Sequence, residues 1–344
     1  MNRTTILLAA FLASLLSGNA EPQKETLNQF SYENLGSDHL TCYVRKDGND
    51  TNTGLKNTAT GAFLTIQRAV NELGMQRRNG DCWVYVGDGT YQESVEISGG
   101  DWIGNHTLFL VGNVEEPSSC VVDTIGLTGD AVTVQRDISV TVKGFKLLSD
   151  RNGLHVRMHA YCEQEQMDYG ECGASHIKVS KFSQLSCSAD YTISGSSKNH
   201  ILATENTTVS IKGCHIEFIG SPHFSGAIFN GSYGNTTFVF NTPLLTHSGR
   251  VTGKKYLVAA NGVMLTTATS PDFLPGDLEG EAFGGGRFIM YTLREDYHTP
   301  GGWTSPTGAA RRSGFDTSTA TTQEVAETLK ALIDDLMTKG DLRE

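Results

Sequence analysis

AVTVQRDISVTVKGFKL, residues 131–147, can be laid over HILATENTTVSIKGCHI, residues 200–216, at an offset of 69 residues. Val132, Val134, Val140, Val142 and Leu147 fall on Ile201, Ala203, Val209, Ile211 and Ile216, and the Lys-Gly at 143–144 falls on the Lys-Gly at 212–213. Within each stretch apolar and polar residues alternate, which is the period of a β-strand with one face in a core. The pair of stretches therefore indicates strands that repeat.

The offset of 69 residues divides into three nearly equal steps. The apolar residues at matching places are Val132, Leu154, Ile177 and Ile201, which lie 22, 23 and 24 residues apart. A steady period of about 23 is typical of a solenoid, in which each repeat buries its apolar side only by stacking on its neighbours. We therefore expect an all-β, right-handed parallel β-helix over residues 41–290. A β-sandwich is the alternative, but it offers no reason for such a period.

Helices are expected only near the two ends of the coil. Residues 62–73 carry apolar side chains at helical spacing and would cover the open first edge of the coil. Residues 321–340 begin with a capping box, Thr321 to Glu324, and continue with one apolar stripe. That stripe predicts a C-terminal amphipathic helix, which could fold back on the coil or associate with copies of itself. We expect residues 21–40 to be a lead and 291–320 a linker.

The first twenty residues have the organisation of a signal peptide. A weakly basic start is followed by the uncharged apolar run 6–16 and by small residues at 17–20. A buried N-terminal helix is the alternative interpretation. No later stretch is apolar for long enough to cross a bilayer. The sequence therefore predicts a secreted, extracellular protein without a membrane span.

An exported chain with seven cysteines is expected to form disulfides, although an odd count leaves at least one thiol over. Cys162 and Cys172 bracket a short acidic segment and are the expected local pair.

Glycosylation is expected if the host is eukaryotic. The candidate acceptors are Asn49, Asn105, Asn206, Asn230 and Asn235.

Composition narrows the classes of function. The formal net charge of −11 argues against general nucleic-acid binding, which needs clustered Lys and Arg. The stretch DGNDTNTG at 47–54 does not place Gly and Glu where a calcium-binding EF-hand loop needs them. No phosphate loop or dinucleotide fingerprint occurs, and we expect no metal and no cofactor.

Both ends of the expected coil resemble a known family. YVRKDGNDTNTG (43–54), followed by GAFLTIQRAV (61–70), resembles the opening of the right-handed parallel β-helix proteins of phage tails, in the pectin-lyase-like superfamily. FLPGDLEGEAFGGGRFIM (273–290) resembles their closing segment, and residues 305–340 resemble the terminal segment of phage virion proteins. The likeness is weak over 155–187, where the chain carries what looks like an insert. The resemblance implies a carbohydrate surface as partner and a homotrimer.

The resemblance and the signal peptide imply different routes out of the cell. Phage tail proteins leave the cell by lysis, so they need neither an export signal nor many cysteines. A phage-type coil that acquired an export signal, by horizontal transfer to a bacterium or a eukaryote, accounts for both features.

A basic strip is the candidate binding site. In GLHVRMHA (153–160) the alternation points Leu154, Val156, Met158 and Ala160 inward. The side chains expected to point outward together are His155, Arg157 and His159, with Lys178 one repeat further on. Such a strip suits an anionic sugar such as a uronate, with Arg157 as a clamp or base. An ordinary solvated face is the alternative.

No catalytic residue can be assigned. Glycosidases need two carboxylates held across one bond, and no acidic pair recurs at one repeat spacing with the same facing. The acidic segment with Glu163, Glu165, Asp168 and Glu171 could hold calcium or be a disulfide-closed surface loop. The single candidate carboxylates are Asp88, Asp101, Asp123, Asp130 and Asp150, and the aromatic residues that could stack on sugar rings are Tyr91, Trp102 and Tyr161.

The sequence thus favours a secreted β-helix that binds a carbohydrate surface and to which no catalytic residues can be assigned; it leans against an enzyme without deciding the matter. A secreted polysaccharide lyase or glycoside hydrolase is the first alternative, because the superfamily contains many such enzymes. A secreted effector or toxin-like component is the second, because a durable coil can be retained without phage function. Fold by itself does not decide among them.

Overall fold

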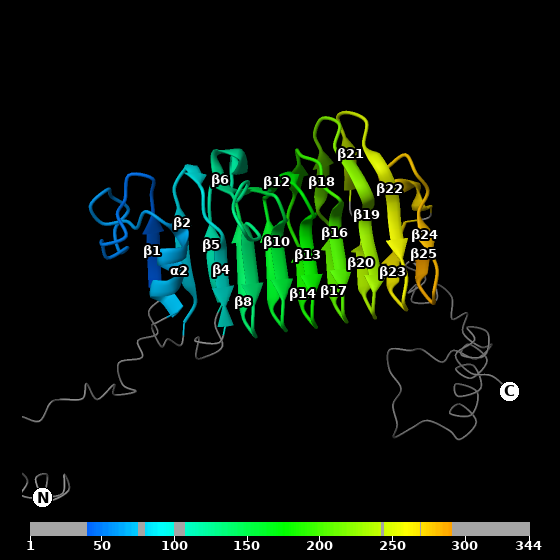
Figure 1. Cartoon of the computed structure of the whole chain (residues 1–344), viewed down its shortest axis with the longest axis horizontal. Coiled ribbons are helices and arrows are strands. Elements are labelled where there is room, and N and C mark those ends of the chain that lie inside the picture. The colour runs from blue at the N-terminus through cyan, green and yellow to red at the C-terminus, as the bar shows by residue number, and fades with distance from the viewer. Residues whose placement is uncertain (1–39, 75–79, 100–106, 242–243, 269, 291–344) are drawn as a thin grey trace, which may run out of the picture.

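A computed structural model describes residues 40–74, 80–99, 107–241, 244–268 and 270–290. The expected signal peptide, the linker and the C-terminal helix lie outside these ranges, as does all of the N-terminal lead except residue 40. The described residues form an all-β parallel solenoid of about eight turns. Successive turns stack along one axis, from β1 at one end to β24 and β25 at the other (Figure 1).

Each turn of the coil contributes one strand to each of three parallel sheets, which enclose a single core. The ten-stranded sheet contains β1 (Leu40–Val44), β2 (Cys82–Val86), β5 (Thr107–Val111), β8 (Ser139–Lys143), β11 (Tyr161–Glu165), β14 (Gln184–Cys187), β17 (Thr208–Lys212), β20 (Thr237–Asn241), β23 (Val263–Thr266) and β25 (Arg287–Met290). The seven-stranded sheet contains β3 (Gly89–Tyr91), β6 (Cys120–Asp123), β9 (Lys146–Ser149), β12 (Asp168–Cys172), β15 (Tyr191–Ile193), β18 (His215–Phe218) and β21 (Leu244–His247). The eight-stranded sheet contains β4 (Val95–Ser98), β7 (Val132–Gln135), β10 (Asn152–Arg157), β13 (Ser175–Ser180), β16 (Asn199–Thr204), β19 (His223–Tyr233), β22 (Thr252–Val258) and β24 (Glu281–Ala282).

The register follows the apolar positions of the central repeats. Leu154 pairs with Val132 and with Ile177, and Ile177 pairs with Ile201. Outside these turns the step is longer: Val95 pairs with Val132, 37 residues on. The loops between sheets therefore differ in length while the strands keep their alignment, and a period of 23 describes only the central turns.

Helical structure is scarce. The helix α2 (Ile66–Gly74) begins four residues later than the expected 62, and its buried face packs against β1, β2 and β4. The carboxylate of Glu93 accepts the first backbone N–H groups of α2, from Ile66 and Gln67, at 2.8 and 2.9 Å. Two short 3₁₀ segments are Pro117–Ser119 and Pro271–Phe273. Among the described residues, no helix is long and apolar enough to span a bilayer.

The acidic segment expected as a surface insert is part of the coil. Residues 161–172 form β11 and β12, which pair with strands of the turns before and after them. The carboxylate of Asp168 is buried and lies 2.9 Å from the amino group of Lys146. The interpretation as a disulfide-closed loop was wrong, because its polar residues obscured the alternation of a regular pair of strands.

The expected disulfide between Cys162 and Cys172 does not form. Cys162 lies on β11 and Cys172 ends β12, so the two residues belong to different sheets. All seven cysteine side chains are buried, and the structure has no disulfide among the described residues. Burial raises the pKa of the Cys214 thiol to about 11 and that of Cys120 to about 12, so these thiols stay protonated and act as small apolar side chains.

The corner between the eight-stranded and ten-stranded sheets repeats one backbone shape. Two consecutive residues other than glycine have positive φ in five turns, at 136–137, 158–159, 181–182, 205–206 and 260–261. This conformation costs about 1 kcal/mol or more for each such residue. Backbone hydrogen bonds of 3.0 to 3.2 Å join neighbouring corners and offset that cost, such as the 3.0 Å bond from His159 N–H to the carbonyl of Lys181.

Two histidines lie inside the core. His176 and His200 are fully buried, with their Nδ1 atoms 3.3 Å apart, and Nε2 of His200 lies 2.8 Å from the hydroxyl of Tyr191. Aromatic rings surround the pair, among them Phe224 and Tyr169. Burial lowers the pKa of both histidines, that of His176 to about 4. Both are therefore neutral near pH 7.

We expect Val134→Asp to abolish stable folding. Val134 is fully buried and points into the solenoid, where a carboxylate has no partner, so the cost is several kcal/mol, on the order of the whole stability. Thermal unfolding followed by circular dichroism measures the effect. Val121→Asp is the matched control, because Val121 on β6 is only half-buried and should tolerate the change. Equal melting temperatures for the two variants would contradict the register.

We expect the free energy of unfolding to fall as pH drops from 6.5 toward 4. The unfolded histidines have a pKa near 6.5, so the unfolded chain binds protons that the folded core excludes. The loss is about 1.4 kcal/mol per pH unit for each histidine, and the stability is fully present only above pH 6.5. Urea unfolding at pH 7, 6 and 5 measures it. His176→Gln should reduce the slope of the unfolding free energy against pH by the contribution of one histidine. An unchanged slope would show that His176 does not contribute to the pH dependence.

Candidate functional site

The outer face of the eight-stranded sheet carries the polar residues singled out in the sequence. Alternation turns Leu154 and Val156 into the core, so His155 and Arg157 face outward. In the register His155 lies beside Lys178, and Arg157 lies beside Ser180 of β13. The register thus puts His155 and Lys178 side by side on this face.

These side chains do not form one flat, exposed strip. Only Arg157 and Lys178 are half-exposed, whereas His155 is buried, with 6% of its surface accessible. His159 lies beyond the end of β10 at the left-handed corner, where its ring stacks on that of Phe182 with centroids 5.3 Å apart. Met158 shares that corner and is half-exposed rather than inward. The expected alternation fails there because the strand has ended.

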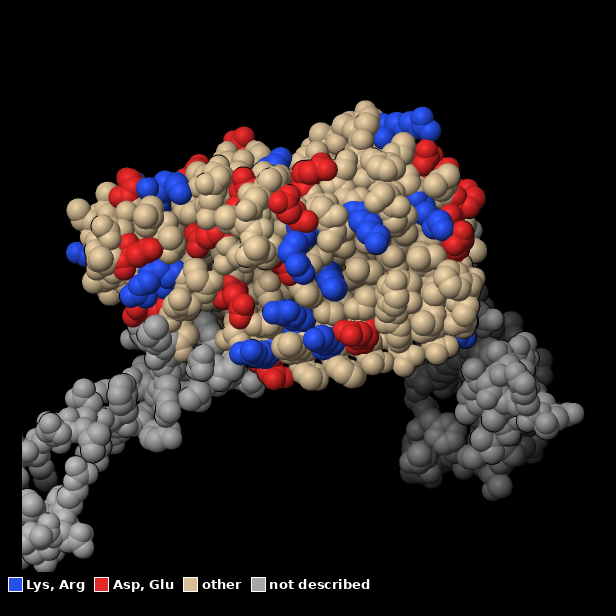
Figure 2. Space-filling view, viewed as in Figure 1, with Lys and Arg blue, Asp and Glu red and all other residues tan. Residues whose placement is uncertain are grey.

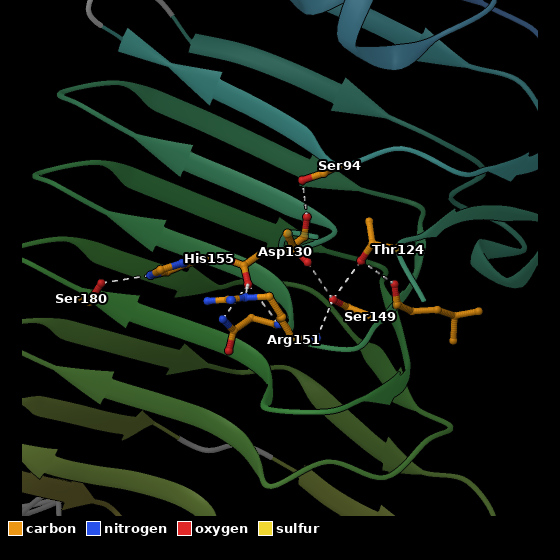
Figure 3. A network of polar contacts seen from close by, with 10 residues as sticks. Ser94, Thr124, Asp130, Ser149, Arg151, His155 and Ser180 are labelled. Atoms are coloured by element: carbon orange, nitrogen blue, oxygen red, sulfur yellow. Dashed lines mark hydrogen bonds and ion pairs between the residues drawn. The ribbon is translucent and has the colours of Figure 1, made fainter. Parts of the chain in front are cut away.

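His155 is the centre of a hydrogen-bond chain that spans three turns of the coil (Figure 3). Its Nδ1 lies 2.8 Å from Oδ2 of Asp130, and its Nε2 lies 3.1 Å from the hydroxyl of Ser180. Asp130 precedes β7, His155 lies on β10 and Ser180 ends β13. All three side chains are buried, at 8%, 6% and 3% exposure.

The surroundings of Asp130 fix its charge and orientation. Burial alone would raise its pKa, but hydrogen bonds from His155 and Asn152, with the attraction of the histidine, hold the pKa at about 2. Oδ1 accepts both the backbone N–H and the side-chain amide of Asn152, at 3.1 and 2.7 Å. The hydroxyl of Ser94 donates to the Asp130 carbonyl at 2.6 Å. The carboxylate is therefore ionised and rigidly held.

The corner beneath Asp130 is braced by a second set of polar contacts, drawn in Figure 3. The hydroxyls of Thr124 and Ser149 lie 2.9 Å apart, and Ser149 accepts the backbone N–H of Arg151 at 2.9 Å. The guanidinium of Arg151 is largely exposed and lies 3.7 Å from the Asp130 carboxylate. The corner therefore presents Asp130 to His155 in one fixed geometry.

The charge on Asp130 selects the tautomer of His155. An ionised carboxylate can only accept a hydrogen bond, so Nδ1 must carry the proton. Burial lowers the pKa of His155, although Asp130 opposes this, and the nearby charges of Lys178 and Arg157 lower it further. Near neutral pH the ring is uncharged, and its Nε2 lone pair accepts the hydroxyl of Ser180. The arrangement can take a proton from that serine.

Several cations on this face lack an acidic partner. Figure 2 shows Lys and Arg side chains gathered over its central strands, although the chain as a whole is acidic. Arg157 donates its Nε to Gln135 at 2.7 Å, which leaves the rest of the guanidinium available. Within the described ranges, the cations of this face and its corner that form no ion pair include Arg136, Arg157, Lys178, Lys181 and Lys198.

An open groove of about 670 Å³ continues this face toward the later turns. Leu202, the register neighbour of Lys178, lines its near side. Lys198 and Tyr233 border it, and Tyr233 is 64% exposed. The sequence analysis missed this groove, because it forms where β19 extends beyond its neighbours and no motif marks that place.

The other sequence candidates lie apart from this face or are buried. Tyr91 is buried and cannot stack on a ligand, whereas Tyr161 is 39% exposed, on the ten-stranded sheet. Asp88, Asp123 and Asp150 each accept a hydrogen bond of their own, from Asn113, from the N–H of Ile125 and from the N–H of Gly126. Asp101 and Trp102 lie outside the described residues.

Two further sets of candidates can be placed. Glu163, Glu165, Asp168 and Glu171 are spread over two sheets, and within the described ranges no three His, Cys, Asp or Glu residues gather as a metal site. Among the sequons, Asn49, Asn206 and Asn235 are exposed. Asn230 is buried and donates its amide to Asn199, so it cannot accept a glycan in the folded coil. Asn105 lies outside the described residues.

Comparison with protein-family models, curated proteins and solved structures found no match.

We expect His155 to remain neutral, with its proton on Nδ1, at pH 6.5 and above. Burial lowers its pKa from about 6.5, and Asp130 fixes the tautomer. Nitrogen chemical shifts of ¹⁵N-histidine-labelled protein measure both properties. Asp130→Asn should lower the pKa further, because it removes the charge that opposes burial. Asp137→Asn, at an exposed corner position, should leave His155 unchanged. A His155 charged at pH 7 would contradict the assigned tautomer and charge.

Proposed function

We propose that the protein binds an anionic polysaccharide, such as a uronate-containing chain, along the outer face of the eight-stranded sheet. The observation that carries the proposal is a group of cations that form no ion pair with any described residue, among them Arg157, Lys178, Lys181 and Lys198, on an otherwise acidic protein. A solvated face of no function would be expected to pair its cations with the abundant Asp and Glu. A repeating polyanion matches cations spaced by the turns of the coil.

The groove beside these cations suits sugar rings. Tyr233, at the end of β19, offers an exposed ring face for the C–H surface of a sugar. Lys198, which precedes β16 at the opposite end of these strands, can meet a carboxylate. Phe182, 56% exposed, and the ring of His159 stacked on it extend an aromatic ridge along the corner. We infer that a chain of several sugars lies across the strands, contacting Arg157 and Lys178 and continuing into the groove.

The resemblance to phage tail β-helices supports the same class of ligand and stays a prediction. We infer a right-handed coil, because connections between parallel strands of one sheet nearly always have that hand. Secretion, a phage origin and a homotrimer complete this proposal.

Two alternative functions make different demands on the outer face of the eight-stranded sheet. A lyase or glycosidase remains the first alternative, and the carboxylates described above lack the paired arrangement that glycosidases use. An effector or toxin-like role is the second, and it predicts no polysaccharide affinity at this face.

We expect Arg157→Ala and Lys178→Ala each to weaken binding of a polyuronate about tenfold, because each removes a charge-assisted contact worth about 1.5 kcal/mol or more. Affinity should also fall as salt is raised, since these cations are partly exposed. Isothermal titration calorimetry with polygalacturonate and with a neutral glucan measures both.

Lys212→Ala is the matched control for these variants. Lys212 is an exposed lysine on β17 of the ten-stranded sheet, so its loss should not change the affinity. Equal affinities for polyuronate and neutral glucan, or binding unchanged by Arg157→Ala and Lys178→Ala, would refute the proposed function.

A further inference from the structure

We propose that Ser180, His155 and Asp130 form a nucleophilic site that hydrolyses ester groups, such as O-acetyl groups, on the bound polysaccharide. The inference rests on the proposed function for its substrate class. The chemistry itself rests on the hydrogen-bond chain, which has the order and connections of a serine nucleophile, a histidine base and an orienting carboxylate.

The geometry meets the requirements of such a site. The Ser180 hydroxyl lies 3.1 Å from Nε2 of His155, and Nδ1 of the same ring lies 2.8 Å from Asp130. Asp130 has its remaining oxygen held by Asn152, so it cannot turn away. The three residues come from three successive turns of a rigid coil, which keeps their positions fixed.

Arg157 and Lys178 supply positive charge where a tetrahedral intermediate would carry an oxyanion. Arg157 is the register neighbour of Ser180, and Lys178 is that of His155, so the two cations flank the serine–histidine pair. Neither has an acidic partner in the described part of the chain. Cationic groups already in place can stabilise developing negative charge without rearrangement.

The reaction balances without a cofactor. The Ser180 Oγ attacks the ester carbonyl carbon and transfers its proton to Nε2 of His155, and the carbonyl oxygen takes up the negative charge. Collapse breaks the bond to the sugar oxygen, which takes the proton from Nε2 and leaves as an alcohol. Water then attacks the acyl-serine by the same route, releasing the acid and restoring Ser180.

Access to Ser180 requires side-chain motion only. Ser180 is 3% exposed but points to the outer face of its sheet, and its register neighbour there is the long, half-exposed Arg157. Rotation of such side chains takes picoseconds to nanoseconds.

The hydrogen-bond chain from Asp130 through His155 to Ser180 could instead have a purely structural role, because three linked side chains also hold three turns together. The two roles differ in one property. A mechanical chain leaves Ser180 an ordinary alcohol, whereas the proposed site makes it react with acylating and phosphonylating reagents at neutral pH.

The test uses the full chain with a fluorophosphonate probe and with O-acetylated polygalacturonate, reading the labelled residue by mass spectrometry and the released acetate directly. We expect labelling at Ser180 and acetate release. Ser180→Ala and His155→Gln should lower the release at least a hundredfold. Ser186→Ala, on β14 of the ten-stranded sheet, is the matched control and should change nothing.

Folding and binding are measured beside activity. Ser180→Ala should melt within a few degrees of the wild type and keep its affinity for unacetylated polygalacturonate. Retained affinity in Ser180→Ala would show that binding and ester hydrolysis can be tested separately. The proposed binding function fails only if the protein does not bind polygalacturonate. If Ser180→Ala does not fold, labelling of Ser180 in the wild type still decides. If the wild-type protein is neither labelled at Ser180 nor releases acetate, the proposed catalytic site is refuted. The hydrogen bonds among Asp130, His155 and Ser180 then have a structural role only.

Discussion

The structure depends on the parallel register, in which each strand is held at a fixed place against the strand of the next turn. An inward residue such as Val134, Val156 or Val179 is covered only because its neighbours in the stack cover it. The same register aligns outward residues into rows along the coil. Any chemistry on the outer face is therefore assembled from single residues contributed by successive turns.

This constraint explains why the polar chain at Asp130 is so well ordered. Asp130 is placed by a corner, His155 by a strand and Ser180 by the end of the next strand, and each position is set by main-chain pairing. The left-handed corners have a similar origin. Their unfavourable backbone shape persists at residues such as Lys181 and Phe182 because each corner is bonded to the next.

The contrast between the interior and the outer face is electrostatic as well as steric. Inside, burial keeps His176, His200 and the cysteine thiols neutral, so the core behaves as an apolar one despite its polar composition. Outside, Arg157 and Lys178 form no ion pair with the described part of an acidic protein. The face proposed to bind a polyanion thus also carries the buried, oriented serine–histidine pair, which connects the proposed binding and the proposed ester hydrolysis.

The sequence by itself determined the class of fold, the register of the central turns and the outward facing of His155, Arg157 and Lys178, because period-two alternation and a constant step are local properties of the chain. It misjudged residues 161–172 as an insert, since polar residues such as Gln164 and Asp168 are buried there and disguise the strands. It could not find Asp130 and Ser180 as partners of His155, nor the groove at Tyr233. Those contacts join residues about 25 positions apart whose identities follow no motif, so only the stacking of turns in three dimensions decided them.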